Sequence, residues 1–303
     1  MPLIINTNTL SLNAQTHLTN NTNSLQKSME KLASGFRINR AGDDAAGLQL
    51  SENLRSQFRG AQKAADNVQD AINMLNIADG AMQVIEDNLQ RIRELSVQAA
   101  NDTYSQNQRD AINQEINARL NDIDRIAQAT VYNNNNLLDG TFGGGANVWI
   151  QVGPNADDGI PATPELNRID VAGAVDDARI ANLTAGAVAP AAVITSVQSG
   201  GGGVNITDSN SAQAVIASMD EAIDTLNVQR GNLGSFVNQL ESAWANLAQS
   251  VENMQAAESR IRNVDVAQES ATLVKYQILQ QSAATILAQA NQTPALALQL
   301  LQG

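Results

Sequence analysis

Proline is absent from two long stretches of this chain, residues 3–153 and 191–293. Because proline interrupts a helix more strongly than any other residue, both stretches are free to form long helices. Twelve of the twenty glycines, by contrast, fall between Gly140 and Gly203. The glycine runs at 143–145 and 200–203 indicate linkers. The chain therefore predicts two helical arms, 1–140 and 206–303, on either side of an insertion at 141–205.

The second arm carries a heptad pattern, in which apolar residues recur at alternate steps of four and three. Such a seam is typical of a coiled coil. A helix over 215–261 would be about 70 Å long at 1.5 Å per residue, so only long partner helices could cover it. Arg230 and Glu258 interrupt the series. The predicted seam consists of Ile223, Leu226, Leu233, Val237, Leu240, Trp244, Leu247, Val251 and Met254.

The first arm contains two shorter apolar series that could supply these partners, one over 68–99 and one over 112–127. The residues between them, 101–105, are Asn-Asp-Thr-Tyr-Ser, which favour turns and helix N-caps. We therefore expect the first arm to turn back at 101–105. The predicted fold class is mainly α, with long antiparallel coiled-coil helical arms from both termini and a small β-containing inserted domain.

The two ends and the insertion differ from these long helices. Residues 10–36 and 264–301 form moderately amphipathic patterns whose apolar stripes are diluted by Asn, Thr, Ser and Gln. A pair of such helices is marginal in water on its own, so we expect other molecules to cover it. Within the insertion, residues 148–152 and 168–171 alternate in the manner of strands.

Composition excludes several classes of function. The net charge of -13 disfavours a duplex nucleic-acid binder and docking on an anionic membrane. Without cysteine, and with His17 as the one histidine, the chain has no thiolate chemistry and no two-histidine metal site. Asp157 and Asp158 lack the spacing of a calcium loop. We expect no enzymatic activity, no cofactor and no metal.

Nothing in the sequence predicts membrane insertion. No apolar run is long enough to span a bilayer. Residues 1–6 lack the charged and apolar regions of a secretory signal peptide. We therefore expect the protein to be cytoplasmic, or exported by a route that does not use such a signal.

Both arms resemble the flagellin family, while the insertion does not need to match it. The matching segments are Ile4–Asn8, Leu32–Asn39, Ala41–Leu48 and Leu89–Leu95 in the first arm, and Ala256–Arg262 and Leu287–Gln292 in the second. The resemblance implies a structural subunit that polymerises into the extracellular filament of the bacterial flagellum, used for swimming. It also implies export by the flagellar type III route. A hook–filament junction protein, which shares the terminal helices, is the alternative.

The same resemblance implies roles for the parts of the chain. Residues 1–45 and 264–303 would be helices of the inner filament core. Residues 46–140 would form a long helix and a return helix of the outer core, 206–263 a long outer-core helix, and 141–205 a variable exposed domain. Implied partners are further copies of the chain, an export chaperone and the filament cap protein.

A further implied partner is the vertebrate Toll-like receptor that senses flagellins. Gln90, Arg91, Leu95 and Glu115 resemble the receptor-binding surface of the family. Arg91 would make a desolvated bidentate contact, and Leu95 would be an apolar anchor.

Overall fold

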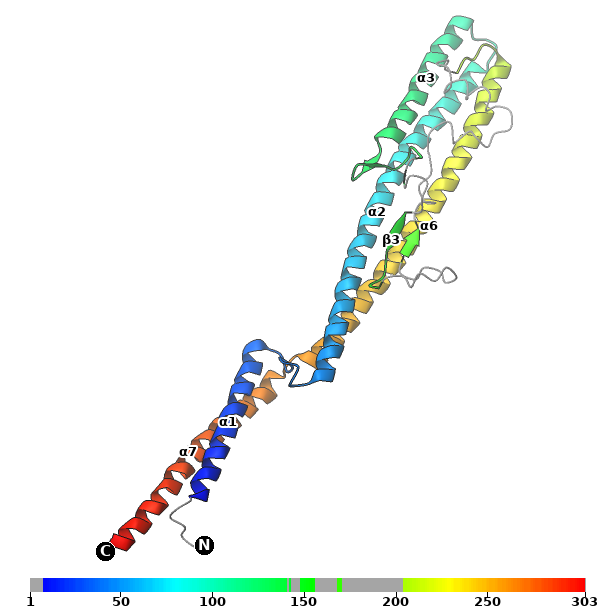
Figure 1. Ribbon diagram of the computed structural model, residues 1–303. Helices are drawn as coiled ribbons and strands as arrows, with labels where there is room; N and C mark the ends of the chain where they lie inside the picture. Colours follow the sequence, from blue (N-terminus) through cyan, green and yellow to red (C-terminus); the bar gives the residue numbers. More distant parts are fainter. Residues whose placement is uncertain (1–7, 141, 143–147, 156–167, 171–203, 303) are drawn as a thin grey trace. The chain divides into compact units, whose positions relative to one another are not determined.

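A computed structural model describes residues 8–140, 142, 148–155, 168–170 and 204–302 (Figure 1). Chain contacts divide it into a terminal unit, residues 1–58 and 252–303, and a central unit, residues 59–251. The helices are α1 (Thr9–Ser34), α2 (Ala45–Ala99), α3 (Gln106–Ala129), α6 (Ser209–Arg262) and α7 (Val266–Gln302). The strands are β1 (Val131–Tyr132), β2 (Asn135–Asn136), β3 (Trp149–Gln151) and β4 (Arg168–Asp170).

The first arm reverses direction between α2, which ends at Ala99, and α3, which begins at Gln106. The side chain of Gln108 accepts a hydrogen bond of 2.9 Å from the backbone N–H of Ser105. This contact is one half of a capping box, and it satisfies a donor that the helix itself leaves unpaired. The prediction of a reversal at 101–105 is confirmed.

Three helices, α2, α3 and α6, lie side by side in the central unit (Figure 1). Since aromatic residues make up only 3% of the chain, aliphatic side chains from all three helices fill the core between them. The largest fully buried side chains of this helical core include Leu75, Met82, Ile85, Leu89, Ile92, Ile116, Leu120 and Ile123. The predicted class of long helical arms with a small strand region is confirmed.

Arg230, which interrupts the heptad seam, has partners on the neighbouring helix. Its side chain is 27% exposed, and its Nε lies 2.9 Å from a carboxylate oxygen of Asp79. Glu86, about two helical turns further along α2, pairs with the same guanidinium. The hydrogen bond to Asp79 raises the pKa of Arg230 against the opposing effect of desolvation. The charge therefore sits in the seam because α2 places two carboxylates opposite it.

Two antiparallel pairs of short strands accompany the helices in the described part of the central unit. β3 and β4 pair antiparallel, with Ile150 opposite Ile169, as the alternation in the insertion predicts. β1 and β2 also pair antiparallel, through a turn at Asn133 and Asn134, whose φ angles are 47° and 67°. Asparagine tolerates this left-handed backbone, which two-residue hairpin turns require. The β1–β2 hairpin was not among the strands predicted from the apolar alternation of the sequence.

In the terminal unit, α1 and α7 lie antiparallel, as their hydrogen bonds show. The side chain of Asn8 donates to the carbonyl of Ala290 at 2.8 Å. Further along, Gln280 donates to Thr22 at 3.2 Å, and Ser28 contacts Glu269. Within the described residues, no helix is sufficiently long and apolar to cross a bilayer.

Candidate assembly and recognition surfaces

The terminal unit buries few apolar side chains. Among its described residues, the buried hydrophobic ones are Ala14, Ile38, Ala283 and Ala290. Three of these four are alanines, which contribute little apolar area each. Burial stabilises by about 25 cal/mol per Å² of apolar surface, so the contact between α1 and α7 supplies only a small part of what ordering both helices costs.

Large apolar side chains of the same unit face solvent instead. On α7, Ile286 is 60% exposed and Ile278 is 57% exposed. Several large exposed apolar side chains on one pair of helices are typical of an interaction site. We call these exposed residues of α1 and α7 the assembly surface. It consists of Leu10, Leu12, Met29, Val266, Val274, Ile278, Leu279 and Ile286.

A shallow groove crosses this surface between the two helices. It has a volume of about 390 Å³ and is lined by Leu10, Thr285, Ile286, Gln289 and Ala290. Two of the five lining residues, Leu10 and Ile286, belong to the assembly surface. The groove is therefore an apolar depression into which side chains of another molecule could pack.

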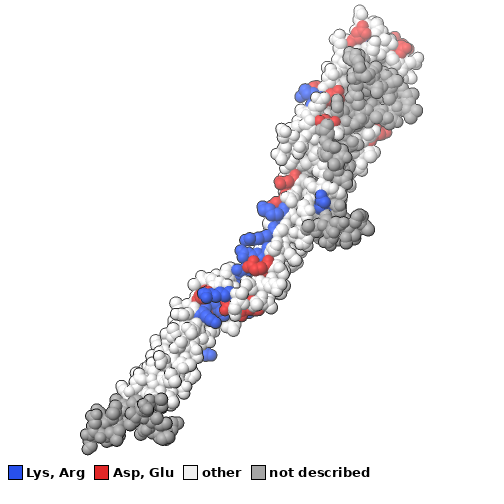
Figure 2. Space-filling view, viewed as in Figure 1, with Lys and Arg blue, Asp and Glu red and all other residues white. Residues whose placement is uncertain are grey.

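The ends of the chain carry no charge. Residues 1–26 and 276–303 contain no Asp, Glu, Lys or Arg. Figure 2 shows the consequence on the face in view, where the helical pair toward the chain ends is neither blue nor red. A contact made by these segments can bury apolar area without the cost of removing charges from water.

A short antiparallel bridge ties the end of α1 to the break between α6 and α7. Phe36 pairs with Asn263, and the N–H of Val264 donates to the carbonyl of Gly35 at 3.0 Å. Gly35 has a φ of 74°, the left-handed conformation that commonly ends a helix. Its own N–H donates to Lys31 at 2.9 Å. Glycine at this position lets the chain leave α1 toward Asn263.

Arg262, the residue before Asn263, also stabilises this connection. Its guanidinium lies 4.6 Å from the centre of the Phe36 ring and 2.6 Å from a carboxylate oxygen of Glu52. Its backbone carbonyl accepts a hydrogen bond from the N–H of Arg37 at 2.6 Å. The connection is therefore stabilised by aromatic, ionic and main-chain contacts.

In the central unit, three of the four residues predicted to contact the receptor, Gln90, Arg91 and Glu115, are exposed and polar. Arg91 on α2 lies 2.9 Å from Glu94 and 3.6 Å from Glu115 on α3. Gln90 is exposed and donates to Glu86 at 3.3 Å. The hydrogen bond to Glu94 is the main cause of the raised pKa of Arg91. Gln90, Arg91 and Glu115 are thus all accessible to a partner.

The structure differs from the expectation for Leu95. Its side chain is only 3% exposed and belongs to the core of the central unit. A side chain buried in the monomer cannot be an exposed anchor for a partner. Leu95 stabilises the helix that presents Arg91.

The residues of the predicted seam lie at different depths along α6. Leu226, Leu233, Leu240 and Leu247 are buried, whereas Ile223, Val237, Val251 and Met254 are half-buried. Trp244 is 44% exposed. Its indole is large and only partly covered by the chain's own residues.

The remaining sequence-based assignments concern charge clusters. Within the described part of the chain, no group of three or more His, Asp or Glu side chains is placed to hold a metal ion. Asp157 and Asp158 lie outside the described residues.

Comparison with known proteins places both arms in one family. Residues 5–143 match the family model for the bacterial flagellin N-terminal helical region, and residues 216–301 match that for the bacterial flagellin C-terminal helical region. A flagellin of Halalkalibacterium halodurans is 40% identical over 300 residues, covering 99% of this chain and 100% of that protein.

Two other proteins resemble the chain. The flagellar filament 33 kDa core protein of Treponema phagedenis is 41% identical over 307 aligned residues, covering 99% of this chain and 100% of that protein. The crystal structure of Bacillus cereus flagellin aligns with a TM-score of 0.46 at 28% identity, covering 64% of this chain and 94% of that one.

Proposed function

Because the chain belongs to the bacterial flagellin family, we propose that neighbouring copies cover its assembly surface as the flagellar filament grows. The protein is a structural subunit that polymerises into this extracellular filament, which serves swimming motility. The exposed apolar residues of α1 and α7 carry the proposal, because the terminal unit has little core of its own. Folding of the ends and assembly would then be coupled.

The parts of the chain have separate places in this proposal. Residues 1–45 and 264–303 form the inner core of the filament, and 46–140 and 206–263 form the outer core. Residues 141–205 form the variable domain exposed to the medium. The uncharged ends support the inner position, since apolar contacts there bury no unpaired charge.

The exposed assembly surface also supports the proposed partners of the free subunit. An apolar surface of this kind promotes aggregation unless it is covered, so an export chaperone would hold the subunit before assembly. Export follows the flagellar type III route, and a cap protein guides addition at the filament tip. The relatives are structural proteins, and the subunit itself has no catalytic activity.

Seeded polymerisation followed by electron microscopy tests the function. Purified subunits should lengthen fragments of their own filament, and they should make up most of a native filament by mass. A hook–filament junction protein would be confined to one end of the filament. A coiled-coil scaffold or adhesin would lengthen no seeds, and either result would remove the filament-subunit assignment.

The insertion should be dispensable for assembly. We expect a chain in which a short linker replaces residues 145–200 to form filaments, because both helical arms stay intact. The replacement removes β3 with its half-buried Trp149 and Ile150, so the melting temperature should fall by about 5 °C for about 2 kcal/mol of lost burial. Electron microscopy and thermal unfolding measure both effects. A variant that is exported but never assembles would contradict the division into arms and insertion.

Recognition by the Toll-like receptor should depend on Arg91. We expect Arg91→Ala monomers to activate the receptor at least about 30-fold more weakly, as for a central interface arginine. Arg91 is exposed, so the substitution should leave the fold intact. The measurement is a cell-based receptor assay with monomeric protein. If assembled subunits bury this surface, filaments should signal less than monomers.

A matched control separates this effect from a general loss of positive charge. Arg125 is also exposed on the central unit and pairs within its own helix with Asp122 at 3.0 Å. Arg125→Ala should signal like the wild type. Equal signalling by Arg91→Ala would remove the recognition proposal. Leu95→Ala should lower stability by about 2–5 kcal/mol, as for other buried leucines, and so affect signalling indirectly.

A further inference from the structure

Three polar side chains on α3 contact the segment 204–207, through which the chain returns from the insertion to α6. Arg109, Asn113 and Asn117 follow one another at intervals of four residues. Residues at this spacing lie on one face of a helix. Each of the three contacts the main chain of the returning segment, which runs antiparallel to α3.

The hydrogen bonds form an ordered series along this face. Asn117 donates to the carbonyl of Val204 at 3.0 Å. The Asn113 amide donates to the carbonyl of Ile206 at 3.2 Å and accepts from the N–H of Ile206 at 2.9 Å. Asn113 therefore pairs with both polar groups of one residue's main chain, as a neighbouring β-strand would.

The two hydrogen bonds between Asn113 and Ile206 are buried, so these main-chain groups have no water to replace a lost partner. Asn113 is 7% exposed, Val204 is 2% exposed and Ile206 is fully buried. An unpaired polar group in such surroundings favours opening of the segment by about 10- to 100-fold. Asn205, between the two buried residues, is exposed. The segment thus presents its apolar side chains inward and its peptide groups to α3.

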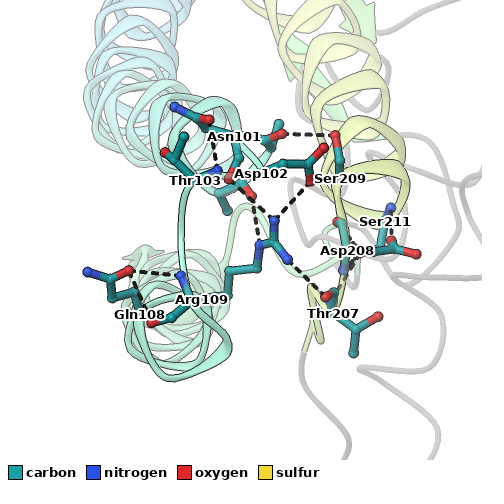
Figure 3. Close-up of polar contacts among 12 residues, drawn as sticks. Asn101, Asp102, Thr103, Gln108, Arg109, Thr207, Asp208, Ser209 and Ser211 are labelled. Atoms are coloured by element: carbon teal, nitrogen blue, oxygen red, sulfur yellow. Dashed lines mark hydrogen bonds and ion pairs between the residues drawn. The ribbon is translucent and has the colours of Figure 1, made fainter.

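Arg109 extends the series to the end of α2 (Figure 3). Its guanidinium donates to the carbonyl of Thr207 at 3.3 Å and to the carbonyls of Ala99 and Asn101, also at 3.3 Å. The side chain is only 11% exposed, and it pairs with Asp102 at 3.1 Å. One arginine therefore connects the returning segment with the carbonyls that α2 leaves unpaired at its C-terminus.

The start of α6 is fixed directly beside this point (Figure 3). The Ser209 hydroxyl donates to the carbonyl of Ala100 at 2.8 Å. Asp208 accepts from the Ser211 N–H at 2.7 Å, and this hydrogen bond is the main cause of its lowered pKa. Because residues 204–207 are held in place, the first residues of α6 lie at a defined position beside α2 and α3.

We propose that Arg109, Asn113 and Asn117 form a main-chain clamp that positions the returning segment 204–207 independently of the sequence of the insertion before Val204. The clamp binds peptide groups, so it requires of residues 204–207 only apolar side chains at Val204 and Ile206. The arms of the subunit are thereby joined at a fixed point, whatever insertion lies between them. Asn113 is the central positioning residue.

Asn113→Asp tests the clamp through its dependence on pH. An ionised carboxylate cannot donate to the Ile206 carbonyl, whereas a protonated one can. Burial raises the pKa of such a carboxyl, so the substitution is tolerated in acid, and the destabilisation develops as the pH rises through that pKa. Hydrogen exchange of the Ile206 amide, corrected for intrinsic rate, should be about 100-fold faster than in wild type at pH 7. At pH 4 it should be within about threefold.

Two controls distinguish the clamp from a general effect of the substitution. Asn121→Asp makes the same change at an exposed position of α3, and it should leave protection of Ile206 within about threefold of wild type. Asn205→Ala should do the same, because the Asn205 side chain accepts only a long hydrogen bond of 3.5 Å from the Asn113 amide, beside the main-chain contacts. If Asn121→Asp loses protection as Asn113→Asp does, or if Asn113→Asp shows no recovery in acid, the proposal is wrong.

Two further variants test the clamp even if Asn113→Asp does not fold. One of them also tests whether the clamp depends on the insertion. Asn117→Ala removes one hydrogen bond and should speed exchange at Ile206 about tenfold. Replacement of residues 145–200 by a linker should leave protection of Ile206 within about threefold. Unchanged exchange in Asn117→Ala, or loss of protection in the linker variant, would overturn the clamp.

Discussion

Ile278→Asp and Ile286→Asp are each expected to raise the concentration needed for filament growth at least about 100-fold. Both side chains are more than half exposed in the subunit, so neighbours can cover them. Residues 1–26 and 276–303 contain no Lys or Arg. Lys275, one helical turn before Ile278, could form only an i,i+3 pair, which contributes little. Burying an unpaired charge costs several kcal/mol, and each 1.4 kcal/mol is a factor of ten.

The free subunit should be nearly unaffected, because exposed substitutions usually change stability by less than about 0.5 kcal/mol. Growth on filament seeds, with the soluble fraction measured at equilibrium, gives the critical concentration. Val228→Asp is the matched control, since Val228 is 64% exposed in the central unit. If both isoleucine variants assemble at the wild-type concentration, α7 does not contribute the assembly surface.

Residues 1–45 and 264–303 should be digested rapidly in the monomer and resist digestion in the filament. Ordering a backbone costs about 1–2 kcal/mol per residue. The described buried apolar residues of the terminal unit are one isoleucine and three alanines, which cannot offset that cost. Neighbouring subunits would supply the missing contacts, so only assembled chains should protect their ends.

Limited proteolysis with mass spectrometry measures this difference. A protease of broad specificity samples both ends fully, because trypsin sites within 1–45 and 264–303 are confined to Lys27, Lys31, Arg37, Arg40 and Lys275. The monomer should be trimmed to a stable core near 45–264, and the central unit, with its buried aliphatic core, is the internal control. Equal resistance of the termini in both states would contradict coupled folding and assembly. Ends that fold only on assembly would also allow the subunit to pass through a narrow export channel.

Sequence reasoning failed where a residue's role depends on a distant partner. In the sequence, Arg230 only interrupts the heptad pattern. In the structure, Asp79 and Glu86 of α2 pair with it. Leu95 belongs to a recognisable motif, yet its burial depends on how three helices pack. Asn113 is one of many asparagines in the chain, and only the structure pairs it with Ile206.

The sequence by itself determined the helical arms, the reversal at 101–105 and the strands of the insertion. These features follow from local preferences: freedom from proline, apolar periodicity and N-cap residues act within one or two turns of the chain. Tertiary structure alone decided which charges enter the seam, which motif residues face solvent and how α3 holds the returning chain. Those outcomes depend on pairing residues about 90 to 150 positions apart, and no local periodicity encodes such a pairing.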